Sequence, residues 1–116
     1  MVASAAGAVV LIRFPFSDLS QTKLRPAVVL ASVARGDRIL CQITSKAYGD
    51  PDAIEIGDAA FASGSLRVTS YVRPGKLFTA SEELITVEIA MLDRRVLGQI
   101  VDALVGILRA GKAQRV

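Results

Sequence analysis

Arg25 is the first side chain whose position suggests chemistry in this sequence. It directly precedes Pro26, and a proline restricts the residue before it to extended conformations. We therefore expect the Arg25 guanidinium to project from a rigid strand end, where its paired N–H donors would suit a phosphate group. The alternative is a surface arginine that pairs with Asp18, and the sequence alone leaves both interpretations open.

Thr44 is the second candidate, because it lies near the end of the next apolar segment. Residues 38–45 are expected to form a strand, and its alternation puts Gln42 and Thr44 on one face. If this strand pairs antiparallel with residues 26–33, counting back from the turn between them places Thr44 opposite residue 26 or 27. A hydroxyl and the Arg25 guanidinium would then be neighbours at one end of the sheet.

The residue types that the sequence lacks narrow the chemistry further. There is no histidine, and the single cysteine is Cys41. Ser-His-Asp and Cys-His mechanisms and an intramolecular disulfide are therefore excluded, and a zinc site is disfavoured. Any catalysis must use Arg, Lys, Asp, Glu, Tyr, Ser or Thr, and we expect no metal or other cofactor. Cys41 itself is expected to be a small core residue.

The elements that must position these residues are short strands followed by one helix. Runs of aliphatic and β-branched residues, separated by turn formers, predict strands. Residues 14–24 lack periodicity and are expected to form a long loop. Apolar residues then recur every three or four positions, which predicts a helix over 94–110, capped by Asp93 and ended at Gly111. The strands are expected at residues 9–13, 26–33, 38–45, 53–56, 66–72, 77–80 and 85–89.

The composition predicts one mainly β domain spanning residues 1–116. A chain of 116 residues buries a core without a disulfide or metal, and 52% hydrophobic against 22% charged residues exclude a disordered chain. Several strands and one amphipathic helix favour a small barrel or half-barrel with the helix packed on it. The apolar stretch over residues 1–12 is too short to span a bilayer, and an unpaired thiol makes the cytoplasm the expected location.

Charge is distributed unevenly along the chain. Residues 1–49 carry six basic and two acidic side chains, residues 50–66 carry four acidic and no basic ones, and residues 67–76 carry three basic ones. A basic patch beside an acidic rim would suit a nucleic acid or an acidic protein partner. An ordinary solvated surface explains the same pattern equally well.

Four motifs, in this order and spacing, resemble the PemK/MazF family of bacterial toxins. They are FPFSD at residues 14–18, RPAVVL at 25–30, ITS at 43–45 and SYVRPGKLF at 70–78. The resemblance covers nearly the whole chain. It implies a small SH3-like β-barrel with a C-terminal α-helix, a homodimer, and the toxin of a type II toxin–antitoxin system that binds a cognate antitoxin.

The same resemblance implies metal-independent, sequence-specific cleavage of single-stranded RNA, which inhibits translation and growth. Arg25 and Thr44 match the catalytic pair of the family. The substrate's 2′-hydroxyl would be the nucleophile, and the toxin–antitoxin complex would bind DNA. The residues expected to contact RNA are Phe16, Ser17, Lys23, Ser45, Lys46 and Arg73. For Phe16 the alternative is anchoring of the loop to the core, and for the basic residues it is a plain surface position.

Two other functions remain open at this stage. One is a toxin of the same fold that poisons DNA gyrase without cutting RNA, and the other is an inactive chain that only binds an antitoxin. The pair Arg25 and Thr44 favours the ribonuclease, because the gyrase-poisoning relatives do not depend on it. Residues 20–23, where some family members carry an acidic residue, contain no carboxylate, so the resemblance supplies no general base there.

Overall fold

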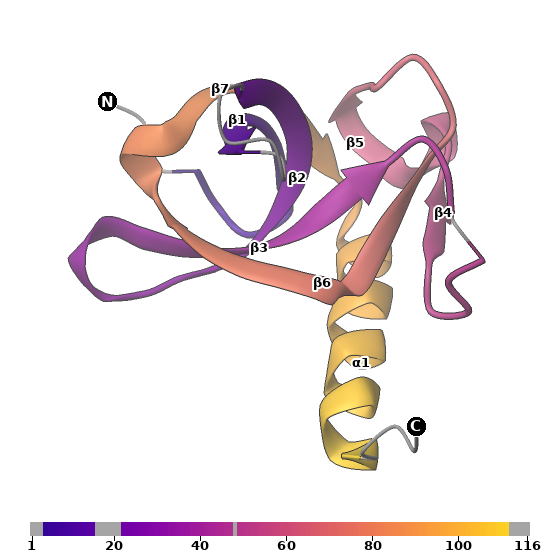
Figure 1. Ribbon diagram of the computed structural model, residues 1–116. Coiled ribbons are helices and arrows are strands. Elements are labelled where there is room, and N and C mark those ends of the chain that lie inside the picture. Colours follow the sequence, from indigo (N-terminus) through magenta and orange to yellow (C-terminus); the bar gives the residue numbers. More distant parts are fainter. Residues whose placement is uncertain (1–3, 16–21, 48, 112–116) are drawn as a thin grey trace.

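The computed structural model describes residues 4–15, 22–47 and 49–111 of the chain. Within these residues, strands make up most of the fold and one long helix follows them, with short 3₁₀ turns between some of the strands (Figure 1). The elements are β1 (Ala8–Pro15), β2 (Thr22–Ser32), β3 (Asp37–Thr44), β4 (Ile54–Ile56), β5 (Phe61–Gly64), β6 (Ser70–Ser81), β7 (Ile85–Leu92) and α1 (Arg94–Ala110).

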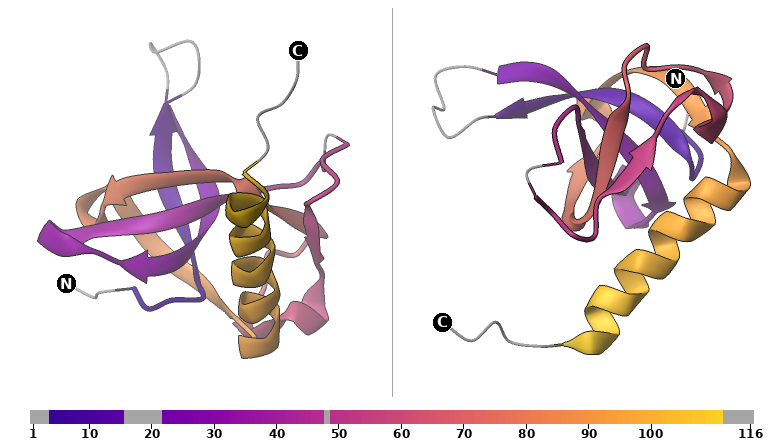
Figure 2. Two further views of the ribbon diagram at one scale, coloured as in Figure 1. Left: turned by 90° about the horizontal axis from the view of Figure 1, so that it is seen from below. Right: turned by 90° about the vertical axis from the view of Figure 1, so that its right-hand side faces the viewer.

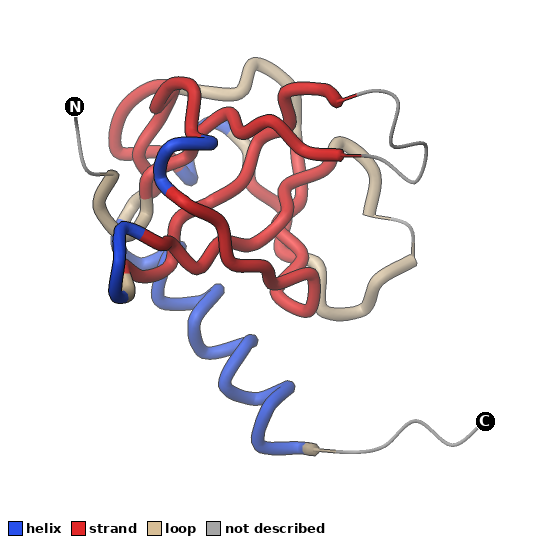
Figure 3. Tube along the Cα trace, turned by 60° about the vertical axis from the view of Figure 1, so that its left-hand side comes forward, coloured by secondary structure: helices blue, strands red, loops and turns tan. Residues whose placement is uncertain are grey.

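The strands form one antiparallel sheet in the order β4-β6-β3-β2-β1-β7-β5. The sheet curls into a half-barrel (Figures 1 and 3), and in the view of Figure 1 β3 and β6 cross beneath the curved β1, β2 and β7. α1 starts against one side of the sheet and extends away from it towards its C-terminal end (Figure 2). The predicted fold class, a mainly β, barrel-like fold with a C-terminal helix, is confirmed.

Apolar side chains are buried on both faces of the sheet, because successive residues of a strand point to opposite sides. The helix-side core joins strand residues to the two buried residues of α1, and includes Val28, Cys41, Ile43, Val72, Val96 and Ile100. The far-side core lies on the other face and consists of Ala8, Val10, Ile12, Ala27, Val29 and Leu40. β2 contributes to both cores, as its uninterrupted apolar run predicts.

The helix begins and ends at the residues that the sequence predicts. The Arg95 backbone N–H donates a 2.8 Å hydrogen bond to Asp93 Oδ1, which caps the first turn. Gly111 has φ 53°, in the left-handed region, and its N–H donates to the Ile107 carbonyl. Glycine adopts this conformation without steric cost, which explains the stop. In the described part of the chain, no helix has the length and apolar character needed to cross a membrane.

β6 is the largest departure from the predicted strands. The sequence predicts two strands, 66–72 and 77–80, around a Pro-Gly turn, but one strand runs from Ser70 to Ser81. Consecutive residues of β3 pair with Arg73 and Leu77, so the residues between these two form a three-residue bulge. The strand continues through the proline because the bulge leaves that residue outside the ladder.

Two further segments differ from the expectation. β5 lies where the sequence pattern predicts no strand, because its small residues show no alternation, and its pairing with β7 supplies the hydrogen bonds. The predicted loop over residues 14–24 is shorter at both ends, since Pro15 pairs with Thr22 and extends β1 and β2. The rest of that loop lies outside the described residues.

Candidate functional site

Four alternate residues of β3 form a row on the far side of the sheet. This β3 row consists of Arg38, Leu40, Gln42 and Thr44, and Leu40 belongs to the far-side core. Burial falls along the row: the first two residues are buried, and the last two are half-buried. The predicted alternation is confirmed, and the half-buried end of the row is where the two candidate catalytic residues are expected.

Arg25 lies within β2 and not at its start, so the prediction of a strand-end position is wrong. The side chain is exposed, and the residue pairs across the sheet with Ile12 of β1. Paired residues of neighbouring strands point to the same side. Because Ile12 is part of the far-side core, Arg25 projects from the same face as the β3 row.

The register between β2 and β3 relates Arg25 to Thr44. Ala27 pairs with Gln42, and the same offset, continued by two residues, brings Arg25 opposite Thr44. The prediction that residue 27 lies opposite Thr44 is therefore wrong, because Ala27 pairs with Gln42. The cause is a register shift further along β2, which the count from the turn does not include.

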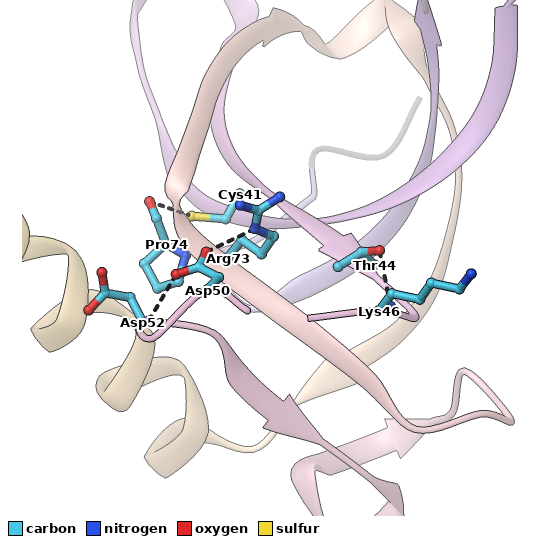
Figure 4. Close-up of polar contacts among 7 residues, drawn as sticks. All are labelled: Cys41, Thr44, Lys46, Asp50, Asp52, Arg73 and Pro74. Atoms are coloured by element: carbon cyan, nitrogen blue, oxygen red, sulfur yellow. Dashed lines mark hydrogen bonds and ion pairs between the residues drawn. The ribbon is translucent and has the colours of Figure 1, made fainter. Parts of the chain in front are cut away.

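Thr44 is the last residue of β3 and is held by a local hydrogen bond. Its Oγ1 accepts a 3.2 Å hydrogen bond from the Lys46 backbone N–H (Figure 4). A threonine hydroxyl both accepts and donates. The bond from Lys46 therefore orients the hydroxyl and leaves its proton for another acceptor.

Two adjoining hollows lie beside this end of the β3 row. The smaller has a volume of about 10 Å³, about what one water molecule needs, and is lined by Ile12, Arg25, Pro26, Gln42 and Phe78. The larger has a volume of about 200 Å³ and is lined by Gln42, Gly75, Lys76, Leu77 and Phe78. Gln42 and Phe78 belong to both hollows, and the sequence did not single out either of them for the site. The alternation that puts Gln42 beside Thr44 was the available signal for the first, whereas Phe78 depends on the β6 register.

Cys41 is hydrogen-bonded to the bulge of β6, which forms one wall of the larger hollow. Its thiol donates a 3.8 Å hydrogen bond to the Pro74 carbonyl, across the β3–β6 pair (Figure 4). Burial raises the pKa of the Cys41 thiol to about 11, so the thiol stays neutral and unreactive near pH 7. The predicted role of Cys41 as a core residue is confirmed.

Arg73 is engaged by an acidic residue from the loop after β3. Its Nε donates to Asp50 Oδ2 at 2.8 Å, and both side chains are largely buried (Figure 4). This hydrogen bond from Arg73, with a second from the Asp52 backbone N–H, holds the pKa of Asp50 below its ordinary value. Asp50 is therefore a structural partner, and the expectation of a solvated acidic rim is wrong at this residue.

The other residues predicted to contact RNA lie in different surroundings. Phe16 and Ser17 lie outside the described residues. Lys23 is exposed on β2, two residues before Arg25, whereas Ser45 and Lys46 are exposed just after β3. No three His, Cys, Asp or Glu side chains of the described ranges gather closely enough to hold a metal ion.

Comparison with known proteins places this geometry in a family. The model of the PemK-like, MazF-like toxins of type II toxin–antitoxin systems matches residues 5–108. Comparison with curated protein sequences gave no match.

Solved structures share the fold at low sequence identity. A MazE–MazF structure from Deinococcus radiodurans has a TM-score of 0.74 at 22% identity, covering 94% of this chain and 98% of that one. An endoribonuclease in complex with its cognate antitoxin, from a mycobacterial species, has a TM-score of 0.67 at 18% identity, covering 99% and 100%. The toxin MazF-mt6 of Mycobacterium tuberculosis has a TM-score of 0.64 at 13% identity, covering 86% and 96%. With its family match over nearly the whole length and the half-barrel of these toxins, the chain belongs to the PemK-like, MazF-like toxins of type II toxin–antitoxin systems.

Proposed function

We propose that this toxin is a metal-independent endoribonuclease that cleaves single-stranded RNA, including mRNA, at specific sequences and so inhibits translation and growth. The observation that carries the proposal is that Arg25 and Thr44 project from one face of the sheet, each two residues beyond the last pair of the β2–β3 ladder, Ala27 and Gln42. The membership of this chain in the PemK-like, MazF-like toxins supports the same assignment.

RNA supplies the nucleophile that the protein lacks. The 2′-oxygen attacks the adjacent phosphorus and loses its proton, while the bond to the 5′-oxygen breaks and that oxygen gains a proton. The products are a 2′,3′-cyclic phosphate and a 5′-hydroxyl. The protein must hold the phosphate in line and stabilise the negative charge that grows on its oxygens.

Arg25 provides the charge stabilisation in this proposal. Its guanidinium donates paired hydrogen bonds, which match two oxygens of a phosphate and strengthen as their charge increases. An arginine keeps its proton at all ordinary pH values, so binding the developing charge is its principal role. Protonation of the leaving oxygen is secondary.

Thr44 orients the phosphate from the neighbouring strand. Because its Oγ1 already accepts the hydrogen bond from the Lys46 N–H, the hydroxyl proton is directed to a non-bridging phosphate oxygen. Lys23, Ser45, Lys46 and Arg73, with Phe16 and Ser17 of the first loop, contact the RNA on either side of the scissile phosphate. The lysines bind phosphates and fix the register of the strand.

The partners of the proposed toxin follow from the same surface. A cognate antitoxin with an acidic, extended segment binds along the basic surface around Lys23, Arg25 and Lys46 and excludes RNA. The active form is a cytoplasmic homodimer whose two sites face a shared groove, and the toxin–antitoxin complex binds DNA. The similarly folded chains of a MazE–MazF structure and of a mycobacterial endoribonuclease in complex with its antitoxin support the antitoxin binding proposed here.

RNA cleavage without metal tests the proposed function. The purified protein is incubated with a long RNA of mixed sequence in excess EDTA, and the fragment ends are mapped. We expect cuts at a short recurring sequence, with 2′,3′-cyclic phosphate and 5′-hydroxyl ends, and no cutting of the matching DNA. Intact RNA, together with inhibition of DNA gyrase by the same sample, would overturn the proposal in favour of the gyrase-poisoning function.

A further inference from the structure

Gln42 carries an unmet hydrogen-bond acceptor at the centre of the candidate site. Its Oε1 atom is buried and accepts no hydrogen bond from any described residue. Among the described side chains, Arg38 Nε also lacks a hydrogen-bond partner, but another nitrogen of the same guanidinium forms an ion pair with Glu82. Buried polar atoms in folded proteins nearly always have partners, so this acceptor is available to a donor that a ligand or a water molecule brings.

The surroundings of Gln42 combine flat apolar walls with basic side chains. It lines both hollows together with Phe78, whose ring packs against the far-side core. Arg25 lines the smaller hollow and Lys76 lines the larger one. An aromatic wall suits a base that has left its stack, and cations on either side suit successive phosphates of one strand.

We propose that Gln42 recognises one nucleobase beside the phosphate that Arg25 binds, by accepting through Oε1 a hydrogen bond from an exocyclic amino group of the base. The proposal rests on the proposed ribonuclease function and names a specificity-determining residue of that same site. It requires no new chemistry, but because Oε1 is buried, the Gln42 side chain must turn towards the hollow when the base binds.

The hydrogen-bonding pattern of the bases gives the expected preference. Adenine, cytosine and guanine carry an exocyclic amino group, at N6, N4 and N2, whereas uracil carries none. A carbonyl oxygen facing Gln42 Oε1 would leave two acceptors in contact. We therefore expect adenosine, cytidine or guanosine, against uridine, at one position flanking the scissile phosphate.

Substrates that lack a single amino group test the proposal without changing the protein. Starting from a mapped cleavage site, each flanking adenosine is replaced by purine ribonucleoside, each flanking cytidine by 2-pyrimidinone ribonucleoside, and each flanking guanosine by inosine. We expect kcat/KM to fall about tenfold at one position, the loss of one hydrogen bond, and to stay within twofold at the others. The analogue that causes the loss shows whether the recognised base is adenine, cytosine or guanine.

Two substitutions and one control connect this effect to Gln42. Gln42→Met keeps the size of the side chain but removes the acceptor. The kcat/KM of this variant should therefore not fall further when the amino group is removed from the substrate base. Gln42→Glu keeps an acceptor and should retain the base preference, although the added negative charge beside the phosphate slows cleavage. Gln99→Met, on the exposed surface of α1, should behave as the unaltered protein does.

The outcomes separate this inference from the proposed function. If the unaltered protein cuts RNA but is insensitive to amino-group removal at every flanking position, the inference is overturned and the ribonuclease stands. The same holds if Gln42→Met keeps the full base preference. If the unaltered protein does not cut RNA at all, the proposed function fails first, and the inference fails with it.

Discussion

The two ends of the β3 row differ in how their polar groups are satisfied. At one end Arg38 is 3% exposed, and its guanidinium forms a 3.0 Å ion pair with Glu82, from the turn after β6. At the other end Gln42 has an orphan acceptor, Thr44 has a hydroxyl proton to donate, and exposed Arg25 lies on the adjacent strand.

This difference assigns separate roles to residues of similar chemistry on one face. A buried arginine that is paired with a carboxylate contributes to the specificity of the fold, because leaving either charge unpaired would destabilise it. In the function proposed above, exposed Arg25, with a half-buried amide and a hydroxyl on the same face, binds an external anion. We therefore expect substitutions at the Arg38 end to change stability, and substitutions at the Arg25 end to change cleavage.

The largest expected effect comes from Arg25→Ala. Cleavage should fall by on the order of 10²-fold or more in kcat/KM, because the paired donors to the transition-state phosphate are lost. Arg25→Lys should restore only part of the rate, since a lysine keeps the charge but not the paired donors. Single-turnover cleavage in EDTA measures both.

The control for this experiment is Arg13→Ala. Arg13 is also exposed, but it follows Ile12 on β1 and so points to the opposite face of the sheet. It should retain the full rate. Equal losses for the two substitutions would show that general positive charge, and not the Arg25 position, supports cleavage.

The next effect concerns stability at the other end of the row. Glu82→Ala leaves the buried Arg38 charge without its carboxylate, and should lower the free energy of unfolding by about 3 kcal/mol. The cleavage rate per folded molecule should stay within twofold. Urea unfolding gives the first quantity, with Glu83→Ala, an exposed neighbour, as the control. An unchanged urea midpoint for Glu82→Ala would contradict the stabilising role assigned to the Arg38 end of the β3 row.

Charge reversal around Arg25 should give a smaller effect on binding. The double substitution Lys23→Glu and Lys46→Glu should weaken RNA and antitoxin binding together, by about tenfold at low salt, and the loss should shrink as salt increases. Titrations of both ligands test this, with reversal of the exposed pair Arg94 and Arg95 on α1 as the control. A loss of RNA binding alone would show that the two ligands use different surfaces.

The smallest effect is a change in the acid dependence of stability. Because Arg73 lowers the pKa of Asp50 in the folded protein, this carboxylate stabilises the fold above its unfolded pKa of about 3.9. That contribution is lost as the pH falls through the lower folded value. Asp50→Asn should therefore cost about 1 kcal/mol at pH 7 and flatten the decline of stability below pH 4.

Asp52→Asn is the matched control for this change. Its side chain is exposed, and its backbone N–H, which donates to Asp50, is retained. Unfolding free energies between pH 2 and pH 7 should follow those of the unaltered protein. If Asp50→Asn shows the same acid dependence as well, the Arg73 contact does not contribute in solution.

Local patterns in the sequence were sufficient for the helix and for the faces of the strands. The side chain of Asp93 caps the helix, and the backbone of Gly111 adopts the left-handed conformation that ends it. Both properties belong to single residues, so the predicted helix bounds were correct. Alternation placed Gln42 and Thr44 on one face because the period of a strand is a local property. The motifs at residues 25–30 and 43–45 pointed to the half-buried end of the β3 row.

Long-range pairing was not predictable in the same way. The bulge after Arg73 and the register shift in β2 arise from hydrogen bonds between distant strands, which no local period contains. For the same reason, the pairing of Arg73 with Asp50 and the two hollows around Phe78 were not found from the sequence. The orphan acceptor of Gln42 could be recognised only once its neighbours were placed.

Mapping of bound RNA on the two ends of the β3 row is the most direct test of this account. An RNA that spans the cleavage site, made uncleavable by a 2′-deoxy group at the scissile nucleotide, is titrated into ¹⁵N-labelled protein. We expect the largest amide shifts at Arg25, Gln42 and Thr44, with Arg38 and Glu82 unchanged. Shifts concentrated at Arg38 and Glu82, with the other end unmoved, would contradict the assignment of the RNA site.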